Sequence, residues 1–593
     1  MASPKDSIET KVERSDYATK EPKAVPTYDP NAPMSTPNYV PAKAEGPGGY
    51  DQGAELGNRL THTLSSSSQR IRGLDFPSLT QQSSHLNNIY RAETAQGYIR
   101  PDEPGLSPIL TGSTHHSIAT TFSRQMTQLA DKKIVTWTEG DKANPWNWGK
   151  ARRWFYTAIC AISVVQVAFM SAIVTGDFGD QMEYFGVSAE VINLTVTLPV
   201  CGFGIGPLLW SPLSELYGRR PLWLIPFVAY IVLNIGCALA PNIGCLLACR
   251  FLAGFFGSGP LTLAGGTIAD MWGPSERGFA IAIFAAAPYG GPVLGPLLGG
   301  FIGKYANWRW LYWVNMCFAG GVWISLLFLP ETFAPILLKR RAKKLRKETG
   351  DSSYVTEQEV LPRPISEIVV ETLIRPFQML VEEPILLLMS LYVSLVYGLL
   401  YAYFFSFPVV FVEGYGWDDA KTGLTFCSVL IGVALALLVT PMLEKRYLAK
   451  GENVTPEDRL PGMLVGGPWV PISLFIFGWT APPYVQPHGG SWVGPCISGI
   501  PFGFGMVLVY FSANAYLIEA FPAYVASALA AKTVVRSAAG AAMPLFITQM
   551  FHRLTNGGAS SLLGGLAIVM AMIPWAFAKW GAQIRARSKR AAV

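Results

Sequence analysis

Long apolar stretches recur along the chain from about residue 155 to residue 579, and short polar links separate most of them. Each stretch holds roughly 20 mainly apolar residues, the length that an α-helix needs to cross a hydrocarbon layer about 30 Å thick. Six stretches precede a long polar segment and six follow it. The pattern predicts twelve transmembrane helices, at about residues 155–176, 190–213, 221–240, 244–268, 278–302, 309–329, 385–411, 422–443, 461–480, 491–515, 524–550 and 560–579.

The polar regions divide the chain into five predicted parts. The first segment is rich in Ser, Thr, Pro, Asn and Gly and has no long apolar run, so we expect it to be disordered. In the central segment, seven of the nine residues from Lys339 to Lys347 are Lys or Arg. The predicted fold is all-α and membrane-spanning, with a disordered tail (1–140), a six-helix bundle (150–332), a basic central loop (333–383), a second six-helix bundle (384–580) and a basic tail (581–593).

The distribution of Lys and Arg predicts how the chain crosses the membrane. Met1 is followed by polar residues, which indicates no cleavable signal peptide and a first tail in the cytosol. Positive charges of short loops remain on the cytoplasmic side. With both termini inside, the outer links carry only four, Lys304, Arg309, Lys421 and Arg553, while the basic central loop lies inside. We expect a plasma-membrane protein, with the vacuole or another internal membrane as the alternative.

Composition excludes several other classes. Half of the residues are apolar, and the net charge of +6 is spread between apolar spans, which does not indicate nucleic-acid binding. The eight Cys residues lie in or beside the spans without CxxC spacing, so we expect small apolar packing and no metal site. No G-x-x-x-x-G-K-[ST] sequence and no nucleophile with a base and an orienting group are found. We therefore expect neither an enzyme nor a cofactor.

The link between the second and third spans holds a charged motif. Glu215 stands three residues before Gly218-Arg219-Arg220. Gly permits a tight reversal between helices, and a Glu can pair with Arg at the membrane face. We predict that Glu215, Arg219 and Arg220 hold an inner gate, and the alternative is an ordinary positive loop.

Two further spans carry unusual residues. Arg250 lies within the apolar fourth span, where a charge is costly and must be held by a carboxylate, by carbonyls or by water. It is a candidate for proton coupling, and the alternative is a structural ion pair at the outer mouth.

The fifth span is rich in Gly and Pro, which allow close packing and bending. We predict that this span forms a hinge and seal between the two halves of the protein, and the alternative is plain tight packing. The residues concerned are Gly291, Gly295, Pro296, Gly299 and Gly300.

Together these stretches resemble the major facilitator superfamily and, within it, the fungal drug:proton antiporter family of twelve-span exporters of drugs, polyamines and secondary metabolites. Ser211 and Glu215 replace the usual Gly and Asp of the signature loop, as in the fungal form. Arg250-x-x-x-Gly254 is similar to the fourth-helix motif with an ascribed part in proton coupling. The fifth span resembles the antiporter motif of exporters. The resemblance covers roughly residues 140–580.

Aromatic and charged residues suggest where cargo and protons bind. The cavity of such a protein lies at the midplane between its halves. Aromatic walls suit amphipathic cargo, although each ring could serve packing alone; the candidates are Tyr397, Tyr401, Phe404, Tyr510 and Tyr516. Asp177 and Glu519 are candidate protonatable groups, with surface exposure as the alternative. Lys532 stands where related transporters often carry Asn, and we expect it to snorkel to the interface rather than attract an anionic substrate.

These features lead to one functional expectation. We expect a proton-coupled antiporter that acts as a monomer, is driven by the proton gradient and exports small amphipathic molecules, such as drugs or secondary metabolites, glycolipids and organic acids included, by alternating access. The alternative within the same class is a proton symporter that imports a nutrient such as a sugar or an amine. The alternative from another class is a non-transporting membrane receptor or enzyme.

Overall fold

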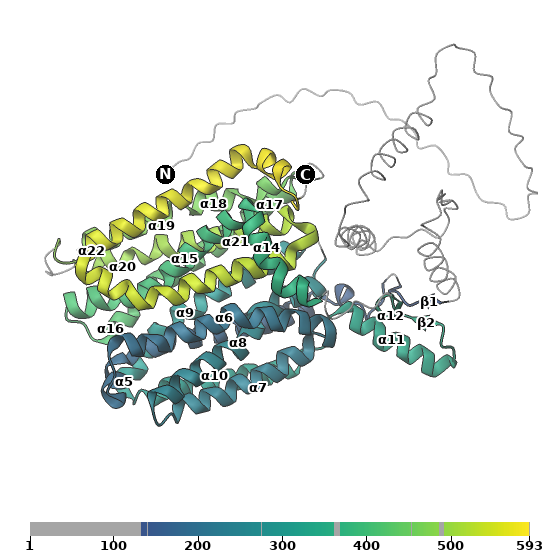
Figure 1. Cartoon of the computed structure of the whole chain (residues 1–593), viewed down its shortest axis with the longest axis horizontal. Coiled ribbons are helices and arrows are strands. Elements are labelled where there is room, and N and C mark those ends of the chain that lie inside the picture. The colour runs from purple at the N-terminus through teal and green to yellow at the C-terminus, as the bar shows by residue number, and fades with distance from the viewer. Residues whose placement is uncertain are drawn as a thin grey trace, which may run out of the picture. The chain divides into compact units, whose positions relative to one another are not determined.

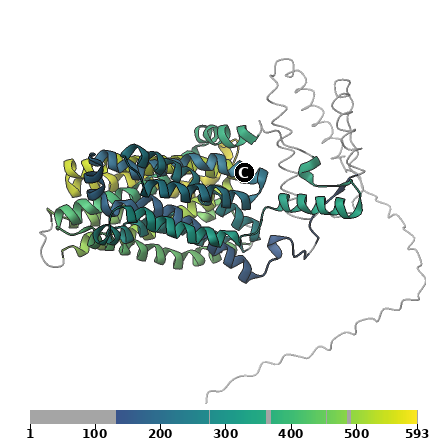
Figure 2. The ribbon, with the colours of Figure 1, turned by 90° about the horizontal axis from the view of Figure 1, so that it is seen from below.

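The computed structural model describes residues 132–138, 140–273, 276–360, 368–451, 454–484 and 491–591; the rest of the predicted tail, up to residue 131, lies outside these ranges. Nearly all of the described chain is helical, and the long helices run side by side in two neighbouring bundles (Figures 1 and 2).

The first bundle is built from the helices before the central linker. The first pass starts as α4 (Lys150–Ala172) and continues through a 3-10 turn, Ile173–Asp177, into α5 (Phe178–Phe185). Asp177 caps α5, because its carboxylate accepts the backbone N–H of Asp180 at 3.2 Å. The bundle is completed by α6 (Ala189–Tyr217), α7 (Arg219–Ala238), α8 (Ile243–Met271), α9 (Arg277–Tyr305) and α10 (Arg309–Leu327).

The second bundle repeats this arrangement with more breaks in its helices. The helix α15 (Pro384–Pro408) runs into a π-helical turn, Val409–Gly414. The next passes each consist of a short and a long helix: α16 (Asp419–Leu424) with α17 (Cys427–Leu448), α18 (Pro461–Gly466) with α19 (Trp469–Thr480), and α20 (Val493–Ile497) with α21 (Gly499–Ala520). The last helix is α22 (Val525–Arg587), and 3-10 turns at Pro456–Arg459 and Pro522–Tyr524 precede α18 and α22.

The structure confirms the predicted twelve spans. Ten helical stretches of the described residues are long and apolar enough to cross a membrane. The last of them contains α22, which leaves the helical conformation at Thr555 (φ 64°, ψ 167°) and then returns along the bundle, so it passes twice (Figure 1). The helix α9 adds the remaining pass, since its 29 residues reach about 44 Å at 1.5 Å per residue.

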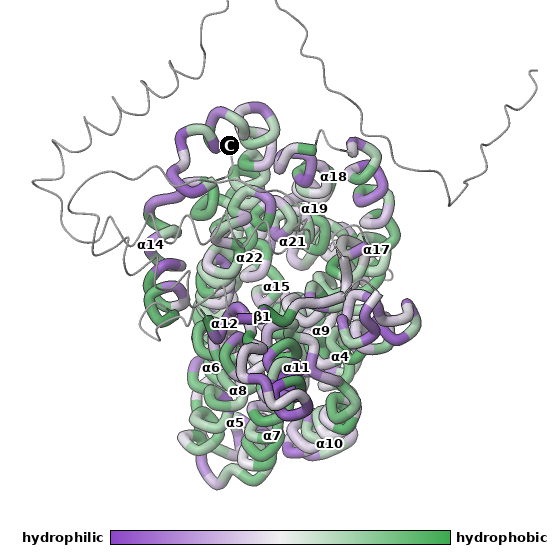
Figure 3. The backbone as a smooth tube through the Cα atoms, turned by 90° about the vertical axis from the view of Figure 1, so that its right-hand side faces the viewer, coloured by the Kyte–Doolittle hydropathy of each residue, from purple (hydrophilic) through white to green (hydrophobic). Residues whose placement is uncertain are grey.

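The outside of the bundles is apolar, as a lipid-facing surface must be. Large apolar side chains such as Ile225, Leu438 and Val569 are more than half exposed. Figure 3, which shows the bundles from one end of the helices, is mainly green and white over the bundles and has purple residues on the linker and on the helix ends that face the viewer. The bilayer is therefore the solvent for this surface.

The central linker is more ordered than a loop. It forms α11 (Ala334–Thr349), β2 (Tyr354–Val355), α12 (Glu357–Val360), a π-helical turn at Val370–Ile374 and α14 (Arg375–Glu382). The sequence analysis did not predict these elements, because the high density of Lys and Arg in α11 indicates a solvated polar segment.

A short segment of the predicted tail joins this linker. The strand β1 (Lys133–Ile134) pairs in parallel with β2, with Lys133 opposite Tyr354. Lys133 also lies 3.0 Å from Asp351, whose pKa falls to about 2, chiefly because the Ser353 backbone N–H donates to it. The predicted boundary of disorder at residue 140 is therefore too late, because pairing with β2 gives this segment the partner that it lacks alone.

Candidate functional site

The predicted residues gather at three levels of the two bundles. One end of the bundles holds the loop between α6 and α7, and we call it the Arg219 end. The opposite end holds the C-terminus of α9 and the start of α16, and we call it the Lys304 end. The tyrosines lie between these two levels, where α9 meets α15 and α21.

At the Arg219 end, a buried carboxylate holds the loop between α6 and α7. Gly218 has a φ of 97°, and a Cβ there would overlap the Glu331 carboxylate. Glu331 accepts the backbone N–H of Arg219 at 2.9 Å and that of Arg220 at 3.3 Å. It also accepts the N–H groups of Thr332 and Phe333, each at 3.0 Å. Because Gly218 has no side chain, the carboxylate of Glu331, which follows α10 in the sequence, can reach the backbone of this loop and anchor it.

The partner of Arg219 is not the one expected from the sequence. Its Nε lies 3.3 Å from Asp270 at the end of α8. Glu215 is exposed, and it forms no ion pair with any described residue, so its predicted pairing is wrong. Ser214 and Gly218 face the interior, and a helix turns about 100° per residue, which carries Glu215 to the outer face. Arg220 is also exposed and donates to the Leu327 carbonyl at 3.2 Å.

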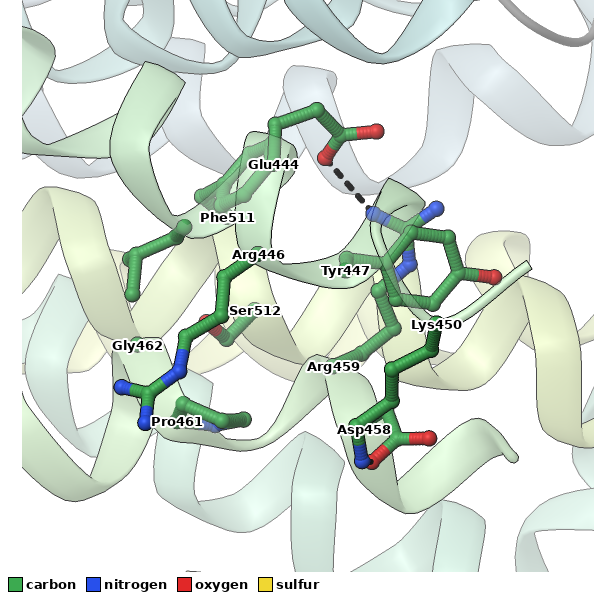
Figure 4. Close-up of a pocket in the computed structure, with 11 residues that line it drawn as sticks. Glu444, Arg446, Tyr447, Lys450, Asp458, Arg459, Pro461, Gly462, Phe511 and Ser512 are labelled. Carbon is green, nitrogen blue, oxygen red and sulfur yellow. Dashed lines mark hydrogen bonds and ion pairs between the residues drawn. The ribbon is translucent and has the colours of Figure 1, made fainter. Parts of the chain in front are cut away.

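The second bundle has a matching ion-pair group at this end. Arg459 lies 2.6 Å from both Glu444 of α17 and Glu519 of α21. The Tyr447 hydroxyl donates to Glu519 at 2.7 Å. Figure 4 shows Glu444, Tyr447 and Arg459 around a pocket of about 270 Å³. Glu519 therefore belongs to an ion pair at the end of the bundle, away from the tyrosines, and its predicted part in proton coupling stays a prediction.

Arg250 lies in the interior of the first bundle and is 0% exposed. Its guanidinium donates to backbone carbonyls: to Thr195 of α6 at 2.7 Å, and to Met170 and Ser171 of α4 at 3.0 and 3.3 Å. It forms no ion pair with a described residue, so an ion pair at the outer mouth is not what holds it. The carbonyls of two helices supply the negative partial charge that a buried cation requires.

A chain of polar contacts leads from Arg250 to Asp177. The guanidinium lies 5.8 Å from the centre of the Tyr312 ring. The Tyr312 hydroxyl donates to the Gln181 side chain at 3.1 Å, and Gln181 donates to the Asp177 carbonyl at 2.7 Å. Asp177 is 6% exposed, and its Oδ2 has no hydrogen-bond partner among the described residues. Arg250 and Asp177, the two candidates of the first bundle, are thus connected through side chains that the sequence did not single out.

The glycines of α9 pack against two different parts of the protein. A Cβ at Gly291 would lie 2.5 Å from the Val165 carbonyl oxygen of α4, and the next two glycines, Gly295 and Gly299, face α4 and the turn after it in the same way. Gly300 instead faces the second bundle, where a Cβ would overlap the Asp419 carbonyl. The Pro296 carbonyl likewise leaves no room for a Cβ at Gly423. Close packing is therefore present on both faces of α9, and hinge motion stays a prediction.

Polar contacts close the Lys304 end across the two bundles. Lys304 Nζ lies 2.7 Å from Asp418, directly before α16, and this ammonium is the first cause of the lowered pKa of Asp418. On another side, Asn193 of α6 donates to the Pro544 carbonyl of α22 at 3.0 Å, and Thr197 donates to Ala541 at 3.0 Å. The two bundles thus meet at the Lys304 end.

Tyrosines from both bundles meet between the two ends. Tyr289 of α9, which the sequence analysis did not single out, lies 5.7 Å from Tyr397 of α15 and 4.8 Å from Tyr510 of α21, between ring centres. Tyr401 continues the cluster to Phe404, with centres 5.4 Å apart. Four of the five predicted cavity residues are therefore close together. The fifth, Tyr516, stacks on Phe577 elsewhere in the second bundle.

Two cations of α22 lie beside these tyrosines. Lys532 is 2% exposed and donates to Asn514, and its Nζ is 4.7 Å from the centre of the Tyr510 ring. The predicted snorkelling of Lys532 is wrong, because its ammonium points to α21 inside the bundle. Arg536, one turn later, is 3% exposed and lies over Tyr397 at 4.6 Å. Sequence analysis missed Arg536, although the argument used for Arg250 applies to any lone cation in an apolar span.

Comparison with known proteins places this arrangement in a family. A family model described as Major Facilitator Superfamily (MFS) matches residues 157–544. An uncharacterized MFS-type transporter of Schizosaccharomyces pombe is 50% identical over 469 residues, which are 78% of this chain and 84% of that protein. Polyamine transporter 3 of Saccharomyces cerevisiae is 41% identical over 94% of this chain and 87% of its own length. An MFS-type efflux pump of Trichophyton rubrum is 44% identical over 78% of each chain.

A solved structure has the same fold. The proton:xylose symporter XylE, bound to 6-bromo-6-deoxy-D-glucose, superimposes with a TM-score of 0.52 over 73% of this chain and 97% of that one, at 17% identity. The family model covers more than half of the sequence, and the fungal relatives exceed 40% identity over most of it. With its twelve spans in two bundles, this chain belongs to the Major Facilitator Superfamily of membrane transporters.

Proposed function

We propose that this protein is a proton-coupled antiporter that exports small amphipathic molecules from the cytosol by alternating access. The observation that carries the proposal is the interface between the bundles, where the Lys304–Asp418 pair closes one end and the buried tyrosines lie further in. Such an interface can admit cargo from one side when the bundles rock about the midplane.

Support for the direction of transport comes from α9 and from a relative. The Gly and Pro residues that pack α9 against both bundles are those that resemble the antiporter motif of exporters. One of the similar proteins is named an efflux pump and another a polyamine transporter. A drug, a polyamine or a secondary metabolite is therefore the cargo class that we test first.

Support for coupling comes from the first bundle. Arg250 and Asp177 are buried in a lipid-facing protein, and Tyr312 and Gln181 lie between the Arg250 guanidinium and the backbone carbonyl of Asp177. Uptake of a proton on one member of such a chain changes the charge that the bundle must stabilise, so it can favour one arrangement of the helices. We infer that the Arg219 end lies in the cytosol of a plasma-membrane protein, because the basic linker and the C-terminal Arg590–Glu382 pair belong to that end, and that both termini are cytosolic.

Reconstitution in liposomes tests the proposal. Liposomes that contain the purified protein and the pH dye pyranine receive either rhodamine 6G or spermidine, with and without an imposed pH gradient. We expect the gradient to drive cargo movement against the proton flow and to reverse it when inverted. Arg250→Ala, at equal protein per liposome, is expected to transport nothing. Movement in the same direction as protons would support an importing symporter instead.

A further inference from the structure

Two buried cations on α22 have no negatively charged partner among the described residues. Lys532 and Arg536 are four residues apart, so they lie on one face of the helix and repel each other. Both are almost fully buried, at 2% and 3% exposure. Neither forms an ion pair with any residue that the structure describes. Two like charges in a water-poor interior are unfavourable unless something else supplies negative charge.

The groups that surround the cations are neutral and leave donors unused. Lys532 donates to the Asn514 side-chain oxygen, and Arg536 donates to the Tyr510 hydroxyl at 3.3 Å. The rings of Tyr397 and Tyr510 give both cations only the weaker attraction of an aromatic face. The Nε of Arg536 and the hydroxyl of Tyr289 are buried without partners in the described part of the chain. A guanidinium has five N–H donors, and in Arg536 the donor at Nε is unused among the described residues.

The position of this cluster makes it accessible during transport. Tyr289 belongs to the first bundle, whereas Tyr397, Tyr510 and the two cations belong to the second. Any rocking motion that parts the bundles must separate Tyr289 from its partners, and it then uncovers Tyr397 and Tyr510, beside which Lys532 and Arg536 lie. A carboxylate can accept two parallel N–H bonds from an arginine and a further one from a lysine.

From this geometry we infer that Lys532 and Arg536 bind the anionic group of the transported molecule, while the tyrosine rings hold its apolar part. The cargo class is thus an amphipathic carboxylate, which deepens the proposed function and rests on it. A polyamine, by contrast, would bring positive charge to a site that already carries two cations, and like charges disfavour that binding.

Binding of matched compounds tests the site directly. The probe is tritiated 2-naphthoate, bound to full-length protein in detergent micelles. Three compounds compete with it. The first, 2-naphthamide, has the same ring without a charge, and 2-naphthylmethylamine has the same ring with a positive charge. The third, spermidine, is a polyamine. We expect the amide and both amines to compete at least about tenfold more weakly than unlabelled 2-naphthoate, as the loss of charged hydrogen bonds requires. Equal competition by the amide would overturn the inference.

Substitutions identify the residues. Lys532→Gln and Arg536→Gln are each expected to weaken 2-naphthoate binding by about tenfold or more. Lys579→Gln is the matched control, since Lys579 is an exposed cation of the same helix, and it should bind as the unmodified protein does. If Arg536→Gln fails to fold, Lys532→Asn and Tyr510→Phe replace it, because they retain polarity or the ring. Unchanged affinity in the folded Lys532 variants would reject the site.

Transport in the pyranine liposomes separates the two proposals. If a pH gradient moves rhodamine 6G or spermidine while 2-naphthoate neither binds nor moves, the anion site is wrong and the antiporter proposal stands. If 2-naphthoate binds and Lys532→Gln removes that binding, but no cargo moves under any gradient, the site stands and the proposed function falls.

Discussion

Lys304 of α9 and Asp418, directly before α16, form an ion pair of 2.7 Å that joins the two bundles at one end of the protein. The two residues are 114 positions apart in sequence. Beside it, Gly300 and Asp419 bring the backbones of the two bundles into direct contact. Charge and close packing therefore act together at this end.

Removing one charge of this pair should loosen the closed end. In Asp418→Asn we expect faster amide hydrogen exchange in residues 414–422, measured by mass spectrometry, with only a small change in thermal stability, because the pair is partly exposed. Glu413→Gln is the control, since Glu413 pairs with His552 and both exposed residues belong to the second bundle. Equal exchange in Asp418→Asn and in the unmodified protein would show that the pair does not close this end.

The pH dependence of the same contact follows from its pKa. Lys304 and the Lys421 backbone N–H hold the pKa of Asp418 below its ordinary 3.8. A lowered carboxyl pKa gives stabilisation that is present above the ordinary value and lost as pH falls through the lowered one. The difference in exchange between Asp418→Asn and the unmodified protein should thus persist from about pH 8 to about pH 5 and vanish only below about pH 4. A transition near neutral pH would contradict this assignment.

Close packing of α9 against the second bundle predicts a sharp difference between two glycines. Gly300→Ala would place a methyl group against the Asp419 carbonyl, whereas a methyl group at Gly290 meets no atom within 4 Å. We expect Gly300→Ala to lower stability by about 1–3 kcal/mol through overpacking and to reduce transport. Gly290→Ala should be neutral or slightly stabilising, because Ala favours helix. Thermal unfolding followed by tryptophan fluorescence compares the two variants.

The anchoring role of Glu331 predicts that its charge matters more than that of the motif residue Glu215. Glu331→Gln leaves an amide group facing backbone N–H donors, so we expect a loss of about 1–3 kcal/mol in the free energy of unfolding. Glu215→Gln removes an exposed carboxylate without an ion pair and should change it by less than about 0.5 kcal/mol. Denaturant unfolding of both variants measures the difference, and equal losses would count against the anchoring of the loop by Glu331.

The contacts of Arg250 predict that lysine cannot replace it. A lysine ammonium is a single point of charge, while the guanidinium reaches carbonyls of α4 and α6 together. We expect Arg250→Lys to reduce gradient-driven transport at least about tenfold, since charged hydrogen bonds are lost in the interior. Arg553→Lys, an exchange of an exposed arginine, is expected to transport normally. Full activity of Arg250→Lys would show that transport needs only a positive charge at position 250 and not the guanidinium group.

Part of the candidate site could be predicted from single residues of the sequence. A lone charge in an apolar span has few possible surroundings, and for that reason the burial of Arg250 was predictable, whereas the choice among a carboxylate, carbonyls and water was not. Partners drawn from other helices were not, because Asp270 and Glu331 are far from Arg219 in sequence. The same limit led to the wrong prediction for Lys532, whose surroundings are set by Asn514 and Tyr510 of α21.

By itself, the sequence determined the twelve spans, their division into two bundles and the family, since apolar length and local motifs depend only on neighbouring residues. The tertiary structure alone decided which charges pair, which tyrosines meet and which cations have no carboxylate partner among the described residues. Those relationships join different helices, such as Arg219 and Asp270, which are 51 residues apart, or Lys304 and Asp418, which are 114 residues apart. Their energies depend on distance, burial and orientation, which no local pattern encodes.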